Sequence, residues 1–210
     1  MSESPSKEIH SESPVSDTTS IDDKREITDP DLERANAAEL SEAAKKALKE
    51  FTSRLSKRSK GALVRHSFVR SDNGTKTPLS RLSSSKGRGA EVAIKLYLGL
   101  LWLSSRPPYD SNFPARSWAA LLNLKDPETK GTRRVSVALK KLEELDLIRI
   151  EQRSGKPNHV VILKEDGSGD PYKIPSGKTT SKDDYYFNVP VRLWTEGYIQ
   201  QLSAAAITML

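Results

Sequence analysis

The sequence predicts a mainly α-helical domain that carries one small antiparallel β-hairpin. Three observations predict this fold class. Residues 91–103 are apolar almost without interruption, over a length that suits a buried helix. Residues 114–145 repeat apolar side chains at three- and four-residue spacing in two successive segments. Residues 147–163 then form two short apolar runs around a turn that contains glycine and proline.

The composition limits the possible functions. The chain has 210 residues, 35% of them hydrophobic, which is enough for one domain with a sizeable core or for two small ones. The net charge of +6 favours a polyanionic partner, and the absence of cysteine excludes disulfides and thiolate metal sites. The chain starts without the apolar run of a secretory signal, and no apolar run reaches the ~18 residues that a transmembrane helix needs. We therefore expect a cytoplasmic protein with no membrane contact.

The N-terminal quarter predicts a disordered tail followed by one long helix. Residues 1–28 are rich in Ser, Asp, Glu and Pro and have few large apolar groups, so we expect them to be disordered. Asp29 and Pro30 suit the N-cap and first position of an amphipathic helix over residues 29–55. Its stripe consists of Leu32, Leu40, Ala44, Ala47, Leu48, Phe51 and Leu55. The stripe is thin, and it leaves open whether the helix docks on the core, pairs in a homodimer or stands free.

A strongly basic segment follows this helix. Residues 56–89 contain nine lysines and arginines against one acidic residue, Asp72, with serines and glycines between them. We expect a flexible basic linker over residues 56–87. It would run along DNA phosphates or reach into a minor groove, or else serve only as a spacer. The candidate contacts in it are Arg65, Arg70 and Lys76.

The main domain is expected over residues 88–166. The apolar segment at residues 91–103 is its first helix, and Trp118, Leu121 and Leu122 mark the buried face of the second. The third helix repeats apolar positions at Val135, Ala138, Leu139, Leu142 and Leu145. Its opposite face carries hydroxyl and basic groups. Two strands follow, and residues 153–158 turn the chain between them.

This order of helix, turn, basic helix and basic hairpin resembles a winged helix-turn-helix domain of the MarR-like or tandem winged-helix replication-initiator kind. The resemblance implies that the basic helix enters the major groove and that the hairpin touches phosphate or the minor groove. Arginine forks match guanine, a valine suits a thymine methyl group, and Thr132 is expected to cap the helix near a phosphate. The candidate DNA contacts are Thr132, Arg133, Arg134, Ser136, Val137, Lys140 and Lys141 on the helix, and Arg153 and Lys156 on the hairpin.

The C-terminal part predicts a loop over residues 167–184 and then a strand, a helix over residues 191–202 and a further helix capped by Ser203. This pattern over residues 185–210 is similar to the opening of a second winged-helix unit. The last residues are apolar, so we expect that the chain is a piece of a longer protein or that this end docks into the core.

No catalytic pattern stands out. The three histidines lack ligand spacing, and there is no nucleophile elbow or carboxylate pair in an apolar setting, so we expect no enzyme, cofactor, metal or small-molecule substrate. The predicted function is sequence-specific double-stranded DNA binding, as a transcription regulator or a replication initiator. The alternative is a winged-helix module for protein–protein contacts in a replication or partition assembly.

Overall fold

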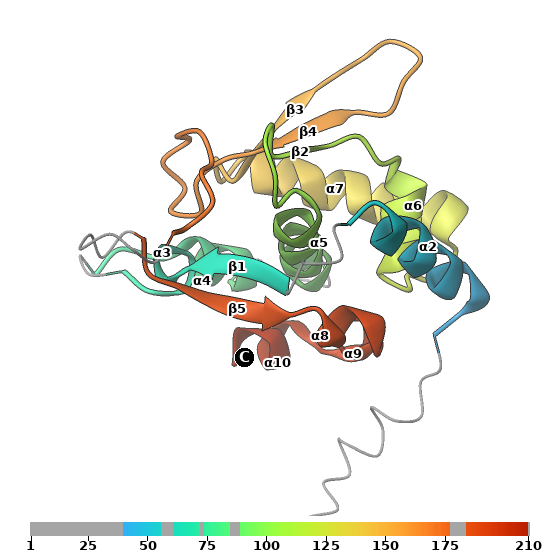
Figure 1. Ribbon diagram of the computed structural model, residues 1–210, viewed down its shortest axis with the longest axis horizontal. Helices are drawn as coiled ribbons and strands as arrows, with labels where there is room; N and C mark the ends of the chain where they lie inside the picture. The colour runs from blue at the N-terminus through green and yellow to red at the C-terminus, as the bar shows by residue number, and fades with distance from the viewer. Residues whose placement is uncertain (1–39, 56–60, 72–73, 85–88, 177–183, 210) are drawn as a thin grey trace, which may run out of the picture.

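The structure is a computed structural model that describes residues 40–55, 61–71, 74–84, 89–176 and 184–209. Helices form most of the regular structure in these ranges, and two small antiparallel sheets accompany them (Figure 1). This agrees with the predicted mixture of helices and a small hairpin. The predictions for the tail at residues 1–28 and for the start of the helix at residues 29–55 lie outside the described residues.

The core is built around α5 (Gly89–Leu103), which runs through the middle of the molecule (Figure 1). Every residue of α5 from Val92 to Trp102 is buried, as its apolar composition predicts. Gly99 allows two tryptophans to approach the helix, because a Cβ atom there would lie 3.0 Å from the ring of Trp118 and 3.2 Å from that of Trp194. The helix is therefore covered from more than one side.

Two helices pack beside α5 and are joined by a tight turn. α6 (Ala115–Leu121) buries Trp118 and Leu121, and α7 (Thr132–Glu143) buries its predicted stripe of Val135, Ala138, Leu139 and Leu142. Asp126 takes a left-handed conformation, with φ of 54°, and starts the π-helical turn η1 (Pro127–Gly131). This turn runs directly into α7.

A three-stranded antiparallel sheet lies beside α7. It contains β2 (Asp110–Ser111), β3 (Ile148–Glu151) and β4 (His159–Ile162), in the spatial order β2-β4-β3. The β3–β4 ladder runs from Ile148 opposite Ile162 to Glu151 opposite His159. The predicted hairpin is thus confirmed, and it projects beyond the helices (Figure 1).

The helix α2 (Glu42–Ser53) docks on the core, which is one of the three alternatives left open. Ser41 caps it by accepting a hydrogen bond from the N–H of Ala44, 3.2 Å away. Its buried face ends in Phe51, whose ring stacks on Phe113 at 3.9 Å and meets the edge of Trp118 at 4.9 Å. The aromatic contacts fix α2 against α6.

The segment predicted as a flexible linker is folded over its described residues, and that prediction is wrong there. It contains β1 (Gly61–Arg65), α3 (His66–Val69) and α4 (Pro78–Ser83). Four of its apolar side chains are buried in the core: Ala62, Val64, Phe68 and Leu82. Charge dominates the composition of the segment, but these side chains are spaced so that they reach one core.

The C-terminal elements complete the same core. β5 (Tyr186–Pro190) pairs antiparallel with β1, and Trp194 stacks on Trp102 with ring centroids 5.3 Å apart. This corrects the expectation of a second winged-helix unit. The partner of β5 is β1, which precedes residues 88–166 in the chain, so β5 belongs to the same fold as the main domain. The helix expected over residues 191–202 is two short helices, α8 (Arg192–Thr195) and α9 (Tyr198–Gln201), separated by Gly197 with φ of 80°.

The last helix, α10 (Ala204–Thr208), has the predicted cap, since Ser203 accepts a hydrogen bond from the N–H of Ala206 at 3.2 Å. Ile207 is buried in the core, whereas Met209 is 89% exposed. Only part of this apolar end therefore docks. None of the helices in the described ranges is long and apolar enough to cross a membrane.

Candidate nucleic-acid interface

The exposed side of α7 forms a ridge that alternates charge, hydroxyl and methyl groups. We call Arg133, Ser136, Val137 and Lys140 the α7 ridge. All four are exposed, and Val137 is 55% exposed although it is apolar. The hydroxyl of Ser136 donates to the carbonyl of Thr132 at 3.0 Å. Within the described part of the chain, neither Arg133 nor Lys140 has an ion-pair partner, so both cations face solvent.

Two side chains fix the rotation of α7 about its axis. On one flank, the ammonium of Lys141 donates to the carbonyl of Leu82 at the end of α4, 3.0 Å away. On the other flank, Glu143 accepts a hydrogen bond from the N–H of Ile150 on β3, 2.7 Å away. The α7 ridge therefore lies between α4 and the β3–β4 hairpin.

This geometry corrects the role predicted for Lys141. Its ammonium contacts α4, and burial lowers its pKa from the ordinary value. We therefore assign Lys141 to the packing of α4 on α7. The neighbouring Arg134 is half-buried on the same flank, where its charge adds to the burial that lowers the pKa of Lys95.

Thr132 does not cap α7, which is a second correction. It is the first residue of the helix and follows η1 without a break, so its backbone N–H donates to the carbonyl of Thr129. Its hydroxyl donates to the carbonyl of Pro127 at 2.7 Å. Because these donors are used within the turn, Thr132 offers no free N–H to a phosphate.

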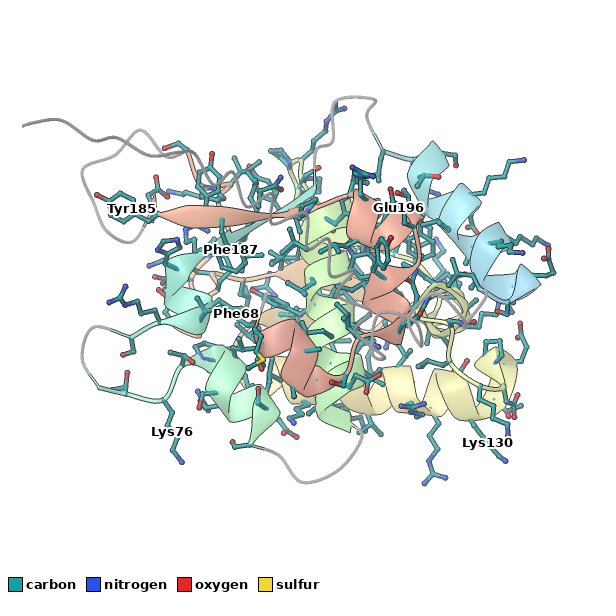
Figure 2. The ribbon with its side chains drawn as sticks, turned by 90° about the horizontal axis from the view of Figure 1, so that it is seen from below. Phe68, Lys76, Lys130, Tyr185, Phe187 and Glu196 are labelled. Atoms are coloured by element: carbon teal, nitrogen blue, oxygen red, sulfur yellow. The ribbon has the colours of Figure 1, made fainter. Side chains whose placement is uncertain are left out.

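The same turn carries a cation that the sequence reasoning missed. Lys130 is exposed on η1, immediately before α7. Figure 2 shows Lys130 and Lys76 pointing outward on one edge of the molecule, along which α4 and α7 run. The sequence pattern predicts only a turn between two helices here. Pro127 and Gly131 do not indicate that η1 continues directly into α7, so the sequence gives no reason to place Lys130 next to that helix.

The hairpin carries the second group of exposed cations. Residues 152–158 between β3 and β4 are all exposed, including Arg153 and Lys156. Gly155 has φ of 66°, which glycine adopts at little cost in a tight turn. Arg149 on β3 is also exposed and lies 3.6 Å from Glu151. The predicted hairpin candidates are therefore accessible.

The three linker candidates separate into two groups. Arg70 and Lys76 are exposed at the ends of α3 and α4, and Arg81 on α4 is exposed as well. Arg65 is 4% exposed, so it cannot contact DNA where it stands. This corrects its predicted role.

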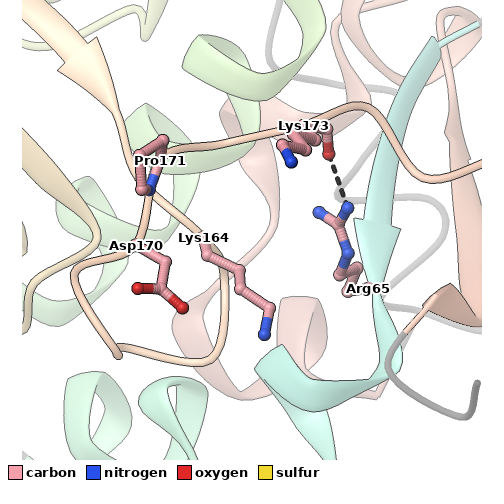
Figure 3. A pocket seen from close by; sticks show the side chains of 5 residues that line it. All are labelled: Arg65, Lys164, Asp170, Pro171 and Lys173. Atoms are coloured by element: carbon pink, nitrogen blue, oxygen red, sulfur yellow. Dashed lines mark hydrogen bonds between the residues drawn. The ribbon is translucent and has the colours of Figure 1, made fainter.

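Arg65 instead belongs to a buried ion-pair network. Its guanidinium donates to Glu165 at 2.5 Å. It also donates to the carbonyl of Lys173 at 2.5 Å, as Figure 3 shows. Asp184 lies 3.4 Å away. Burial raises the pKa of Glu165 against the opposing effect of this guanidinium. Strand β1 is thereby tied to the segment that follows the hairpin.

A pocket of about 320 Å³ lies beside this network, lined by Arg65, Lys164, Asp170, Pro171 and Lys173 (Figure 3). Two of its four charged lining side chains are paired within the protein: Lys164 lies 2.7 Å from Asp166, and Arg65 is held by Glu165. We assign the pocket a structural role. Over the residues that the structure covers, no group of three or more histidine and carboxylate side chains is arranged to hold a metal ion.

Comparisons with protein-family models, with curated proteins and with solved structures gave no significant match to this chain.

Proposed function

We propose that the chain binds double-stranded DNA through a winged helix-turn-helix formed by the elements from α5 to β4. The order α5-β2-α6-α7-β3-β4, with the sheet order β2-β4-β3, is compatible with that fold. In such a domain α7 would be the recognition helix and the β3–β4 hairpin the wing.

The observation that carries the proposal is the α7 ridge beside the projecting hairpin. A helix that reads the major groove needs one face fixed to its domain and one face of free donors. Leu139 and Leu142 fix the first face, while Arg133 and Lys140 supply the second. Arg133 would offer its forked donors to a guanine, and Val137 would meet a thymine methyl group.

Exposed cations on both sides of the ridge would contact phosphates. On one side of the ridge, Arg81 lies on α4 and Lys76 lies just before it. Lys130 precedes the ridge in the chain, and Arg153 and Lys156 lie on the hairpin at the other side. Such contacts position a protein on DNA without reading its sequence, and they make affinity fall steeply with salt. We therefore expect both a preferred sequence and a strong salt dependence, as for a transcription regulator or a replication initiator.

A winged-helix module for protein–protein contacts is the second candidate. The exposed Val137 and the exposed Glu144 one turn beyond Lys140 favour it, because an apolar group and an acid suit a protein surface better than a phosphate backbone. This candidate predicts weak DNA binding with a shallow dependence on salt.

The test is selection of a preferred duplex from a random pool, followed by affinity measurements at several salt concentrations. Arg133→Ala should weaken binding to the selected duplex. Lys49→Ala is the matched control, since it removes another exposed cation, from α2, which packs on α6. No retained duplex at low salt, or equal losses for both variants, would contradict the proposal.

A further inference from the structure

One histidine lies between two carboxylates where the hairpin leaves the sheet. The Nδ1 atom of His159 lies 2.8 Å from a carboxylate oxygen of Glu151, and its Nε2 atom contacts the carboxylate of Asp110. These residues belong to β4, β3 and β2 respectively, so the imidazole connects all three strands. The side chain of His159 is only 14% exposed.

The two contacts fix the protonation state of the ring. Ionised carboxylates only accept hydrogen bonds, and a neutral imidazole has one N–H. Both nitrogens can donate at once only in the imidazolium form. The hydrogen bond to Asp110, followed by that to Glu151, raises the pKa of His159 above its ordinary value, and the opposing effects of burial and of Arg153 are smaller. Arg149, 3.6 Å from Glu151, is a further charged group beside the cluster.

Asp110, His159 and Glu151 lie where the sheet ends and the exposed loop of the hairpin begins. The backbone pairing of β2 with β4 contains only two residue pairs, Asp110 with Val161 and Ser111 with Val160. Glu151 opposite His159 is the last pair of the β3–β4 ladder. Beyond it lies the exposed loop with Arg153 and Lys156. The three side chains are therefore the last ties between the sheet and the cationic end of the hairpin.

We propose that Asp110, His159 and Glu151 form a pH-dependent clamp that holds the hairpin in position for DNA and weakens its contribution to binding once the imidazolium loses a proton. This inference rests on the proposed function. In the neutral ring, one nitrogen has no hydrogen and presents a lone pair to a carboxylate. The two repel each other, so the hydrogen bond to that carboxylate is lost. The pKa of His159 is raised in the folded chain, so the clamp is fully closed below the ordinary histidine pKa and is lost as pH rises through the raised value.

The first experiment needs no DNA. An NMR titration of the His159 ring in the full chain should give a midpoint above the ordinary pKa of histidine. Asp110→Asn should lower the titration midpoint of His159, because it removes one of the two carboxylates. A midpoint of His159 at or below the ordinary pKa of histidine would overturn the clamp.

The second experiment measures affinity for the selected duplex between pH 6 and pH 8.5. The wild-type affinity should fall by about three- to tenfold, the change that accompanies a shift of roughly half to one pKa unit on binding. His159→Gln should bind with the weaker, high-pH affinity at every pH, whereas the matched control His66→Gln should keep the wild-type response. Glu151→Gln, which retains the tie to Asp110, should reduce the response without removing it.

The outcomes separate the two proposals. Tight binding that is independent of pH in the wild type, or an unchanged pH response in His159→Gln, would overturn the clamp alone. Absence of binding at every pH would overturn the proposed function and the coupling together, while the NMR titration would still test the ties among the three side chains.

Discussion

Arg133 is the residue on which the proposed readout depends. It is exposed at the start of α7, and its guanidinium has no ion-pair partner among the described residues. Arg133→Ala should cost roughly 1–3 kcal/mol of binding free energy on the selected duplex, and less on random DNA. Preference should relax at one or two neighbouring base pairs. Affinity measurements on single-base variants of the duplex would check this, and equal losses on selected and random DNA would contradict a base contact.

For Arg65 we expect a loss of folding stability and not of a direct DNA contact. Its removal leaves the buried Glu165 without a counter-charge, and breaking such a pair typically costs about 3–5 kcal/mol of unfolding free energy. Urea unfolding of Arg65→Ala should show a loss of this size. Replacing both partners together, as Arg65→Met with Glu165→Leu, should recover much of it, because neither of the two buried charges then remains without the other.

Arg70→Ala is the matched control for Arg65, since it removes an exposed arginine from the same stretch of chain. Its stability should change by no more than about 0.5 kcal/mol. A stable Arg65→Ala variant would show that the network around Glu165 contributes little.

At the scale of elements, α7 must be anchored before it can present a ridge. Leu139 is 6% exposed in the middle of its buried stripe. Leu139→Ala should lower the free energy of unfolding by about 2–5 kcal/mol, through lost apolar contact and the cavity that remains. Val137→Ala, two residues away on the exposed ridge, should change it by less than about 0.5 kcal/mol. Similar melting temperatures for both variants would contradict the rotation assigned to α7.

The hairpin should act differently from α7. Lys156 lies in the exposed loop between β3 and β4, where a cation meets a phosphate more readily than a base edge. Lys156→Ala should weaken binding to selected and random duplexes by a similar factor and reduce the salt slope by about one. A loss confined to the selected duplex would instead assign base readout to the hairpin.

The whole molecule shows which parts of the fold could be predicted. The helices α5, α6 and α7 and the β3–β4 hairpin were predicted, because each buries a face whose periodicity is local in the sequence. The partner of β1 was not, because β5 lies far along the chain and short strands give weak local signals. The basic composition of residues 56–87 led to the wrong prediction of a flexible linker, because its few buried apolar residues, such as Phe68, lie among many cations.

The candidate site divides in the same way. The exposed positions of the α7 ridge follow from the helical period, so Arg133, Ser136, Val137 and Lys140 could be identified without a structure. The fates of Arg65 and Lys141 could not. Arg65 pairs with a glutamate 100 positions away in the sequence. Lys141 donates to a carbonyl on α4, a helix that the sequence pattern did not predict. Tertiary partners of long side chains are invisible to periodicity.

The last prediction concerns cooperativity across the molecule. Trp194 is fully buried against Trp102, so the C-terminal elements and α5 share one core. Trp194→Ala should cost about 3–5 kcal/mol and should destabilise α7 and β5 equally. Amide exchange in urea would give both elements the same midpoint in the wild type and the same shift in the variant. Tyr198→Ala, on the more exposed face of α9, should shift both much less. Loss of β5 protection while α7 stays protected would mean that the C-terminal segment folds as a separate unit.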